Sequence, residues 1–161
     1  MKSFVCVTLA AVAFAAKSDF PKDDMFHADC HVTAQFDSMS CADLYQGIDK
    51  EIRAWNSDTT SPSQGVYTLK EENDTEYIWS TRLTKNKKYT DDQIFMFEDS
   101  NGGCKVSGHS RSQSVSYYDY SVNFCNLWNV YNNLGSAFTY DTGSCASEPK
   151  SKDVASTCAT Y

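Results

Sequence analysis

Basic side chains are scarce in this sequence relative to acidic ones. Its 161 residues include 14 Lys and Arg against 21 Asp and Glu, which gives a formal net charge of −7 at pH 7. Nucleic-acid binding depends on a basic footprint, and docking on anionic membranes needs clustered Lys and Arg. The charge balance therefore argues against both kinds of partner, and we interpret it as keeping the protein soluble.

Motifs for catalysis and metal binding are also missing. The chain has three histidines, no G-x-S-x-G nucleophile elbow and no C-x-x-C pair. The grouping of His27, Cys30 and His31 falls short of the four ligands of a closed zinc site. Asp91 and Asp92 would likewise need further oxygen ligands to bind calcium or magnesium. The sequence therefore predicts no catalytic residue, no metal site and no cofactor.

A long apolar run occurs once, at residues 4–15 (FVCVTLAAVAFA). It follows a basic start and ends in small residues, which is typical of a secretory signal peptide, and it is too short for a transmembrane helix. We therefore expect residues 1–15 to be a signal peptide, cleaved after Ala15 or Ala16, with no membrane span beyond it. The mature protein is expected to be secreted or to reside in the lumen of the secretory pathway.

The cysteine content agrees with an oxidising compartment. Of seven cysteines, Cys6 lies in the signal peptide. The remaining six form an even set that predicts three disulfides. Sequence alone cannot choose among the possible pairings. Closure of short loops would give bridges that each contribute about 2–4 kcal/mol. Those bridges would join Cys30 to Cys41, Cys104 to Cys125, and Cys145 to Cys158.

Apolar periodicity indicates two helices. Ser40 is a good N-cap for the first, because Asp43 follows three residues later, close to a capping box. Residues 120–134 form the second, with Asp119 as its cap and Gly135 ending it. Apolar residues at helical spacing give each helix one buried stripe. These stripes are Leu44, Ile48, Ile52 and Trp55 in the first helix, and Phe124, Leu127, Tyr131 and Leu134 in the second.

Four strands are expected between the helices, at residues 65–69, 76–84, 93–98 and 104–112. The third is apolar on both faces and should be central, and the Asp-Ser-Asn-Gly-Gly sequence at 99–103 predicts a hairpin turn. Alternation places His109 and Arg111 away from Val106 and Gly108. We expect Arg82 to share the face of His109 and Arg111.

Together these elements predict an α+β fold. A four-stranded antiparallel meander would pack against two helices as a two-layer sandwich stapled by disulfides. Residues 16–40 would form an N-terminal arm, residues 41–134 the α+β domain, and residues 135–161 a C-terminal strap tied down by its cysteines. A lipocalin-like barrel would need about eight strands, more than the sequence indicates.

A known family shares the central motif. Tyr89-Thr90-Asp91-Asp92-Gln93-Ile94-Phe95 is followed by Ser110-Arg111-Ser112 and then by Asp119 and Asn123. This pattern resembles the bacterial and plastid family called domain of unknown function 1499, over about residues 65–134. The chain departs from that family in having Phe124 where members have Arg, and in its cysteines. The resemblance implies a fold and a polar cluster, and carries no assigned activity.

The polar cluster has two interpretations. In one, Arg82 and Arg111 bind a carboxylate or phosphate, Asp92 orients one of them and His109 adds a titrating group. In the other, which we favour, an aspartate pairs with Arg111, Asp119 caps the helix and Asn123 bonds to backbone, so that the cluster fixes the fold. The ligand-binding candidates are Arg82, His109, Arg111, Asp91, Asp92, Asp119 and Asn123.

We interpret the chain as a monomeric binding or interaction domain rather than an enzyme. Aromatic residues make up 14% of it, and the dense segment at 117–120 predicts core packing or an exposed patch for a glycan or protein partner. An anionic small molecule is the other expected ligand. The alternative is a small secreted hydrolase using His109, Arg111 and an aspartate, although Ser110 and His109 would point to opposite faces. Asn73 begins an N-x-S/T sequon in a turn, a candidate glycosylation site.

Overall fold

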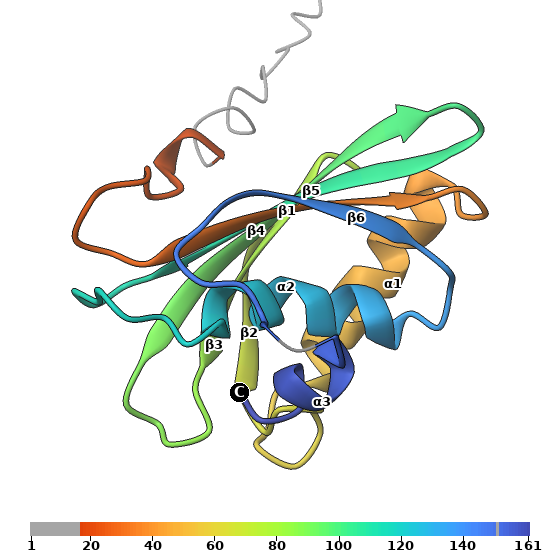
Figure 1. The fold of residues 1–161 in the computed structure, drawn as a ribbon. Helices are drawn as coiled ribbons and strands as arrows, with labels where there is room; N and C mark the ends of the chain where they lie inside the picture. The colour runs from red at the N-terminus through yellow and green to blue at the C-terminus, as the bar shows by residue number, and fades with distance from the viewer. Residues whose placement is uncertain (1–16, 151) are drawn as a thin grey trace, which may run out of the picture.

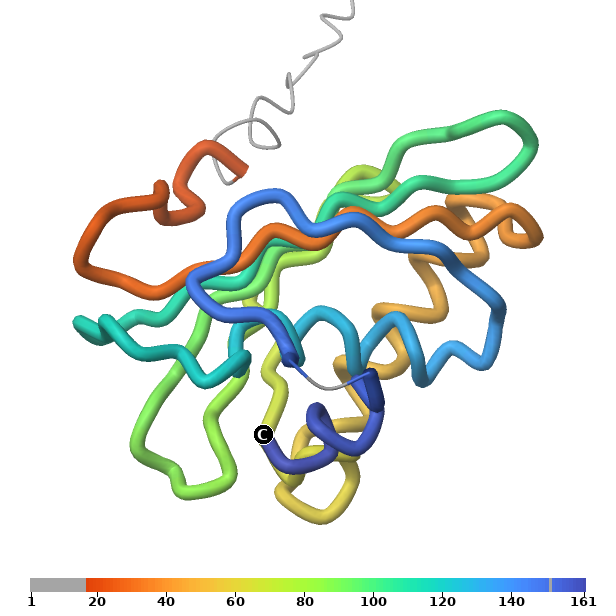
Figure 2. Tube along the Cα trace, viewed as in Figure 1, coloured from red at the N-terminus to blue at the C-terminus, as the bar shows by residue number. Residues whose placement is uncertain are grey.

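The fold is a single antiparallel sheet with helices on one face (Figure 1). The computed structural model describes residues 17–150 and 152–161, so the predicted signal peptide lies outside the described residues. All three α-helices lie on one side of the sheet, and the N-terminal segment, residues 17–28, lies on the other, as the tube in Figure 2 also shows. The predicted α+β class and the packing of sheet against helices are confirmed.

The sheet has six strands in the order β2-β3-β4-β5-β1-β6, rather than the four that were predicted. The predicted meander is present as its first four strands, and the two further strands come from the ranges expected to be an arm and a strap. The bounds are β1 Asp29–Phe36, β2 Val66–Asn73, β3 Tyr77–Leu83, β4 Thr90–Ser100, β5 Gly103–Ser112 and β6 Thr139–Cys145.

Strand β1 forms because its apolar residues alternate with polar ones. Cys30, Val32, Ala34 and Phe36 are all fully buried, and the residues between them are partly exposed. This period of two is that of a strand with one face in the core. β1 pairs with β5 along its whole length and with β6 on its other edge. The range predicted to be an N-terminal arm therefore contributes an inner strand of the sheet.

Helix α1 spans Cys41–Ala54 and begins as predicted. The Ser40 hydroxyl accepts a hydrogen bond from the backbone N–H of Asp43 at 3.1 Å. The predicted stripe of Leu44, Ile48 and Ile52 is fully buried against the sheet. Capping and amphipathicity thus agree in this helix, which explains why the sequence predicted it well.

Helix α2 spans Val122–Asn133, two residues shorter at its start than predicted. It is buried on nearly all sides, because the sheet lies above it and α1 and α3 (Val154–Cys158) lie beside it. Gly135 follows its end with φ of +70°, a left-handed conformation that glycine adopts without strain. A third helix, absent from the prediction, therefore joins the helical layer. A 3-10 turn at Lys17–Asp19 begins the N-terminal segment.

The three disulfides join segments that are distant in sequence, so the expectation of short loops is wrong. Cys30 and Cys145 are cross-strand partners on β1 and β6. The other two bridges connect α1 to β5 and α2 to α3. Pairing follows the folded neighbours, because β1 and the C-terminal elements lie beside parts of the domain far along the chain. The bridges are Cys30–Cys145, Cys41–Cys104 and Cys125–Cys158. Within the described residues, no helix is long and apolar enough to cross a membrane.

Candidate functional site

The seven predicted site residues are divided between the two faces of the sheet. Arg82 on β3 pairs in register with Asp91 on β4, which pairs with Ser112 on β5, and this row points toward the helices. Asp92 pairs with Arg111 in the next row, which points the opposite way. The expectation that Arg82 shares a face with Arg111 is wrong, because the register sets Arg82 in the row of Ser112.

On the helix side, a buried hydrogen-bond network joins β4 and β5 to α2. Asn126 Nδ2 donates to Asp91 Oδ2 at 2.9 Å and to Ser110 Oγ at 3.0 Å. Ser112 Oγ donates to Asp91 Oδ1 at 3.0 Å, and Ser110 Oγ donates to Asn123 Oδ1 at 2.7 Å. All five side chains are buried. Such a network fixes the orientation of α2 on the sheet.

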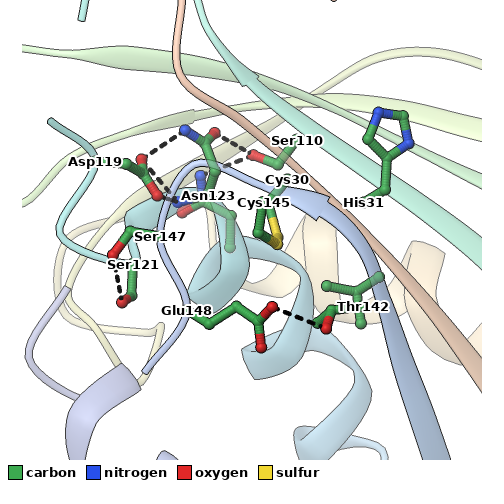
Figure 3. Close-up of a disulfide and its surroundings, with 12 residues drawn as sticks. Cys30, His31, Ser110, Asp119, Ser121, Asn123, Thr142, Cys145, Ser147 and Glu148 are labelled. Atoms are coloured by element: carbon green, nitrogen blue, oxygen red, sulfur yellow. Dashed lines mark hydrogen bonds between the residues drawn. A yellow bond between two sulfur atoms is a disulfide. The ribbon is translucent and has the colours of Figure 1, made fainter. Parts of the chain in front are cut away.

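Asp119 and Asn123 close this network at the start of α2, beside the Cys30–Cys145 disulfide (Figure 3). The Asp119 carboxylate accepts the backbone N–H of Asn123 at 3.1 Å and its side-chain amide at 2.6 Å. Asn123 Nδ2 also donates to the carbonyl of Ala28 at 3.1 Å. Asp119 thus bonds to the first turn of α2 as predicted, although the N-cap position is Ser121 rather than Asp119, and Asn123 bonds to backbone at Ala28.

Two aspartates at this end of the network, Asp119 and Asp91, have raised pKa values. Burial raises the pKa of Asp119 to about 7, and the nearby carboxylate of Asp91 adds to the effect. Burial also raises the pKa of Asp91 above its ordinary value. The two carboxyl groups therefore carry less negative charge near neutral pH than exposed aspartates would.

Two residues before α2 hold a left-handed backbone although neither is glycine. The φ angles are 53° at Tyr120 and 68° at Ser121. This region is sparsely populated by residues with a Cβ, and such strain concentrates at ligand-binding segments. Here it turns the chain so that Asp119 is buried while Tyr120 is 67% exposed. The connection into α2 thus presents an acid inward and an aromatic ring outward.

Arg82 lies at the edge of the network with 1% of its surface exposed. Its Nη2 donates to Ser63 Oγ at 3.0 Å, whereas its Nε and Nη1 have no hydrogen-bond partner among the described residues. Gly65 packs so closely on the guanidinium that a Cβ there would collide with it. Unpaired buried donors are uncommon because desolvation is not offset. The guanidinium is therefore held in place, and two of its buried donors, Nε and Nη1, have no partner among the described residues.

A pocket of about 700 Å³ adjoins Arg82, at the end of the sheet where the β3–β4 loop and the β5–α2 connection meet the C-terminus. Its volume falls within the range of small-molecule sites, about 300–1,000 Å³. Polar groups from the network and a set of tyrosines contribute to its wall. Prominent among the lining residues are Arg82, Asp91, Asp119, Tyr89, Tyr120 and Tyr161.

Exposed aromatic side chains surround this pocket. Tyr89 is 52% exposed and Tyr118 is 79% exposed, and both contribute to the lining with Tyr120. The rings of Tyr118 and Tyr120 stack with centroids 6.3 Å apart. Exposure of several large aromatics together is uncommon on a surface without a partner. The exposed patch expected at residues 117–120 is therefore present, and it borders the pocket.

On the opposite face, Arg111 is paired by the N-terminal segment rather than by either predicted aspartate. Its Nη2 donates to Asp24 Oδ2 at 2.6 Å. Asp92 instead accepts a hydrogen bond from Trp79 Nε1 at 2.9 Å. Hydrogen bonding to His27 is the main reason that the pKa of Asp24 lies well below its ordinary value, so this acid is charged opposite Arg111. Arg111 thus anchors the N-terminal segment to the sheet.

His109 lies on the face of Arg111, beneath the same segment. Its ring stacks on that of His31, its partner on β1, with centroids 3.9 Å apart, and Phe20 covers it at 4.8 Å. The two carboxylate oxygens of Asp23 each lie 3.0 Å from an Nε2, one on His31 and one on His109. Burial and the neighbouring His31 lower the pKa of His109 to about 4, so its ring is neutral at pH 7.

The serines of the hydrolase alternative lie on the other side of the sheet from His109. Ser110 and Ser112 donate to Asn123 and Asp91 in the network facing α2, whereas His109 faces Asp23. Within the described residues the cluster therefore contains no serine–histidine pair of the kind that activates a nucleophile.

The candidate glycosylation site lies at the end of a strand, next to a turn, rather than within the turn that was expected. Asn73 ends β2 at the turn into β3, and its Nδ2 donates to Glu76 Oε2 at 2.8 Å. The side chain is partly exposed. Glycosylation of Asn73 stays a prediction.

Several residues of the two sites were not among the predicted candidates. Asn126 and Asn129 follow Asn123 at a spacing of three, which puts polar groups on one side of a helix whose other positions are apolar. That spacing could have identified Asn126 and Asn129 from the sequence. Asp23 and Asp24 could not have been identified in this way, because nothing in the pattern around them indicates that the chain crosses the sheet at this point.

Comparison with protein-family models and with curated proteins finds no match for this chain. The resemblance to domain of unknown function 1499 stays a prediction from the motif at residues 89–123.

Proposed function

We propose that this protein is a secreted binding protein for a small anionic molecule that carries a ring system, held in the pocket beside Arg82. The observation that carries the proposal is the side chain of Arg82, which lines the pocket, is 1% exposed and has two N–H donors without a partner among the described residues. Secretion is supported by the three disulfides, which form in oxidising compartments.

The acid group of the ligand would bind to the guanidinium. Arginine presents its donors in a planar fork that matches a carboxylate, sulfonate or phosphate. Burial strengthens such a contact, because the local dielectric constant is lower than that of water. Gly65 and Ser63 hold the guanidinium against the wall, so little side-chain entropy would be lost on binding.

The ring system of the ligand would pack among the rim tyrosines. Tyr89, Tyr118 and Tyr120 offer large, partly exposed faces around the opening. Rigid aromatic side chains bury area with little loss of conformational freedom, and stacked pairs add about 0.5–1.5 kcal/mol each. Together the rim and Arg82 favour an amphipathic anion over a neutral sugar.

Protonation of Asp119 couples this binding to pH. Asp119 lines the pocket, and its pKa of about 7 leaves it partly ionised near neutrality. An ionised Asp119 repels an anion at Arg82 and a protonated one does not. Affinity for the anion is therefore expected to increase as the pH falls from about 8 to about 6.

Fluorescence titration with anilinonaphthalenesulfonate, a sulfonate on a ring system, tests the proposal on the disulfide-intact protein. Arg82→Gln is expected to weaken binding by about 10- to 100-fold, the value of a charged hydrogen bond. Arg111→Gln is the matched control, because Arg111 is also a buried arginine but lies on the opposite face. It should leave the affinity within about twofold.

A competition experiment separates recognition of the negative charge from nonspecific hydrophobic binding. Naphthoate should displace the probe, and naphthamide, its neutral amide, should displace it much less. If the amide competes as well as the acid, or if the Arg82→Gln protein binds like wild type, the proposal is wrong. Should Arg82→Gln fail to fold, the exposed double substitution Tyr118→Ala and Tyr120→Ala must still weaken binding, or the pocket is not the site.

A further inference from the structure

We propose that Asp23, Asp29, His31 and His109 form a binding site for a divalent metal ion of the zinc type, on the sheet face opposite the Arg82 pocket. One ligand atom from each of the four side chains lies within 4.8 Å of all the others. This inference does not depend on the anion pocket.

The pairing of β1 with β5 places these ligands close together. His31 on β1 and His109 on β5 are cross-strand partners, so their side chains project side by side from the same face. Asp29 precedes His31 by two residues and therefore points the same way. In Figure 3 the His31 ring points away from α2 and from the disulfide below it. Asp23 arrives from the N-terminal segment and completes the set.

An unpartnered nitrogen is aimed into this cluster. His109 is 7% exposed, and its buried Nε2 has no hydrogen-bond partner among the residues that the structure describes. Asp23 Oδ1 lies 3.0 Å away, but not in the direction that a hydrogen bond requires. A buried imidazole nitrogen normally bonds to something. A metal ion between the imidazole and the carboxylates would satisfy it.

The charges around the cluster also favour a cation. Asp23 and Asp29 lie together, and the nearest arginine, Arg111, is already paired with Asp24 at 2.6 Å. The two carboxylate groups of the cluster supply negative charge, which a divalent ion would balance. Phe20 packs against His109 and shields that side of the cluster from water.

The donor set identifies the kind of metal. Two imidazole nitrogens and two carboxylate oxygens match the four-coordinate preference of Zn²⁺, with bonds of about 2.0–2.2 Å. Tetrahedral bonds of that length place ligand atoms roughly 3.3–3.5 Å apart, close to the 3.0 Å separations from Asp23 to the two imidazoles. Calcium and magnesium prefer oxygen ligands alone. Because the two rings are stacked, one imidazole would have to rotate out of the stack for both nitrogens to bind one Zn²⁺ ion, and the same rotation would not supply the oxygen ligands of a calcium site.

Metal binding would fasten the N-terminal segment to the sheet. Asp23 belongs to that segment, whereas the other three ligands belong to β1 and β5. The ion would add to the contacts of Asp24 with Arg111 and of Phe20 with Trp79. We assign it a structural role.

The test is Zn²⁺ titration by calorimetry on untagged, disulfide-intact protein freed of metal by a chelator. One ion is expected per chain, and Co²⁺ should give the intense visible absorption of a tetrahedral site. His31→Ala and Asp23→Asn, at partly exposed positions, should each weaken Zn²⁺ binding by more than about 100-fold, beyond the loss expected for an outer-shell partner. His109→Gln should do the same.

His27→Gln is the matched control, since it removes the remaining histidine of the chain, which is not one of the four ligands. It should leave the affinity for Zn²⁺ unchanged. Circular dichroism in the presence of chelator verifies that each variant is folded. The proposal is overturned if His31→Ala and Asp23→Asn bind Zn²⁺ as wild type does, if binding depends on His27, or if Ca²⁺ competes at equal concentration.

Discussion

At the scale of the single residue, Asp119 experiences two opposing effects. Its carboxylate accepts the backbone N–H of Asn123 at 3.1 Å, which favours the ionised form. Burial favours the neutral acid and is the larger effect, because it raises the pKa of Asp119 to about 7. The native state therefore binds a proton here over a pH range in which the unfolded chain, with an ordinary pKa of 3.8, does not.

The first prediction follows from that difference in proton binding. As the pH rises from about 4 to about 7, the contribution of Asp119 to stability should fall, by at most about 4 kcal/mol. Asp119→Asn keeps an oxygen acceptor but cannot titrate. Its free energy of unfolding in urea should therefore change less between those pH values than that of the wild type. Equal pH profiles for the two proteins would show that Asp119 is not protonated in the native state.

The sequence predicted which residues belong to the site better than it predicted the face of the sheet on which each one lies. The aspartates, Arg111 and Asn123 were recognised from their motif, and Asp119 was expected as the N-cap of α2, whereas it lies two residues before the N-cap and bonds to the N–H of Asn123. Arg82 was assigned to the wrong face, because its position depends on the register between β3, β4 and β5. A shift of one residue reverses the face on which a side chain lies. Alternation in the sequence shows which residues of one strand share a face, but it does not show which residues of the neighbouring strand lie on that same face of the sheet.

At the scale of the element, α1 shows how much a cap contributes. Ser40 Oγ accepts the N–H of Asp43 at 3.1 Å, whereas Ser121, in the equivalent position before α2, makes no such bond. Ser40→Ala should lower the free energy of unfolding by about 1 kcal/mol. Ser121→Ala is the control and should have a smaller effect. Urea unfolding of both variants measures the difference, and equal losses would contradict the assigned cap.

The strands differ in how far each can be predicted from its own sequence. The meander β2–β5 could be predicted because alternation and the turn at residues 99–103 are properties of the segment itself. β1 carried the same alternating signal in Cys30, Val32, Ala34 and Phe36, and the prediction missed it by treating residues 16–40 as one polar arm. β6 has no buried alternation and is mostly exposed. It is a strand because it pairs with β1, so no local pattern could have predicted it.

At the scale of the whole molecule, the disulfides give a sharp test of the fold. The variant Cys30→Ala/Cys145→Ala removes one observed bridge and should leave no additional free thiol. Cys30→Ala/Cys41→Ala breaks two bridges and should expose the thiols of Cys145 and Cys104. A thiol-reactive dye under denaturing conditions counts them. Pairing through short loops would give the reverse result.

The two faces of the sheet serve different chemistry. The helix side ends in a pocket with an arginine and tyrosines, and the opposite side brings two histidines and two aspartates under the N-terminal segment. β5 supplies residues to both, Ser112 to the pocket and His109 to the cluster, because neighbours of opposite parity along a strand point in opposite directions. Substitutions at Arg82 and at His109 can therefore be analysed independently, provided that each variant folds.

The arrangement of the bridges also determines what a single proteolytic cut can do. The Cys30–Cys145 bond spans every peptide bond between those residues, and Cys125–Cys158 spans those that follow up to Cys158. A protease that cleaves an exposed loop such as residues 85–89 would leave both fragments joined as one covalent molecule. In a protease-rich extracellular fluid, the nicked protein would keep its mass and its sheet, and the damage would appear only after reduction.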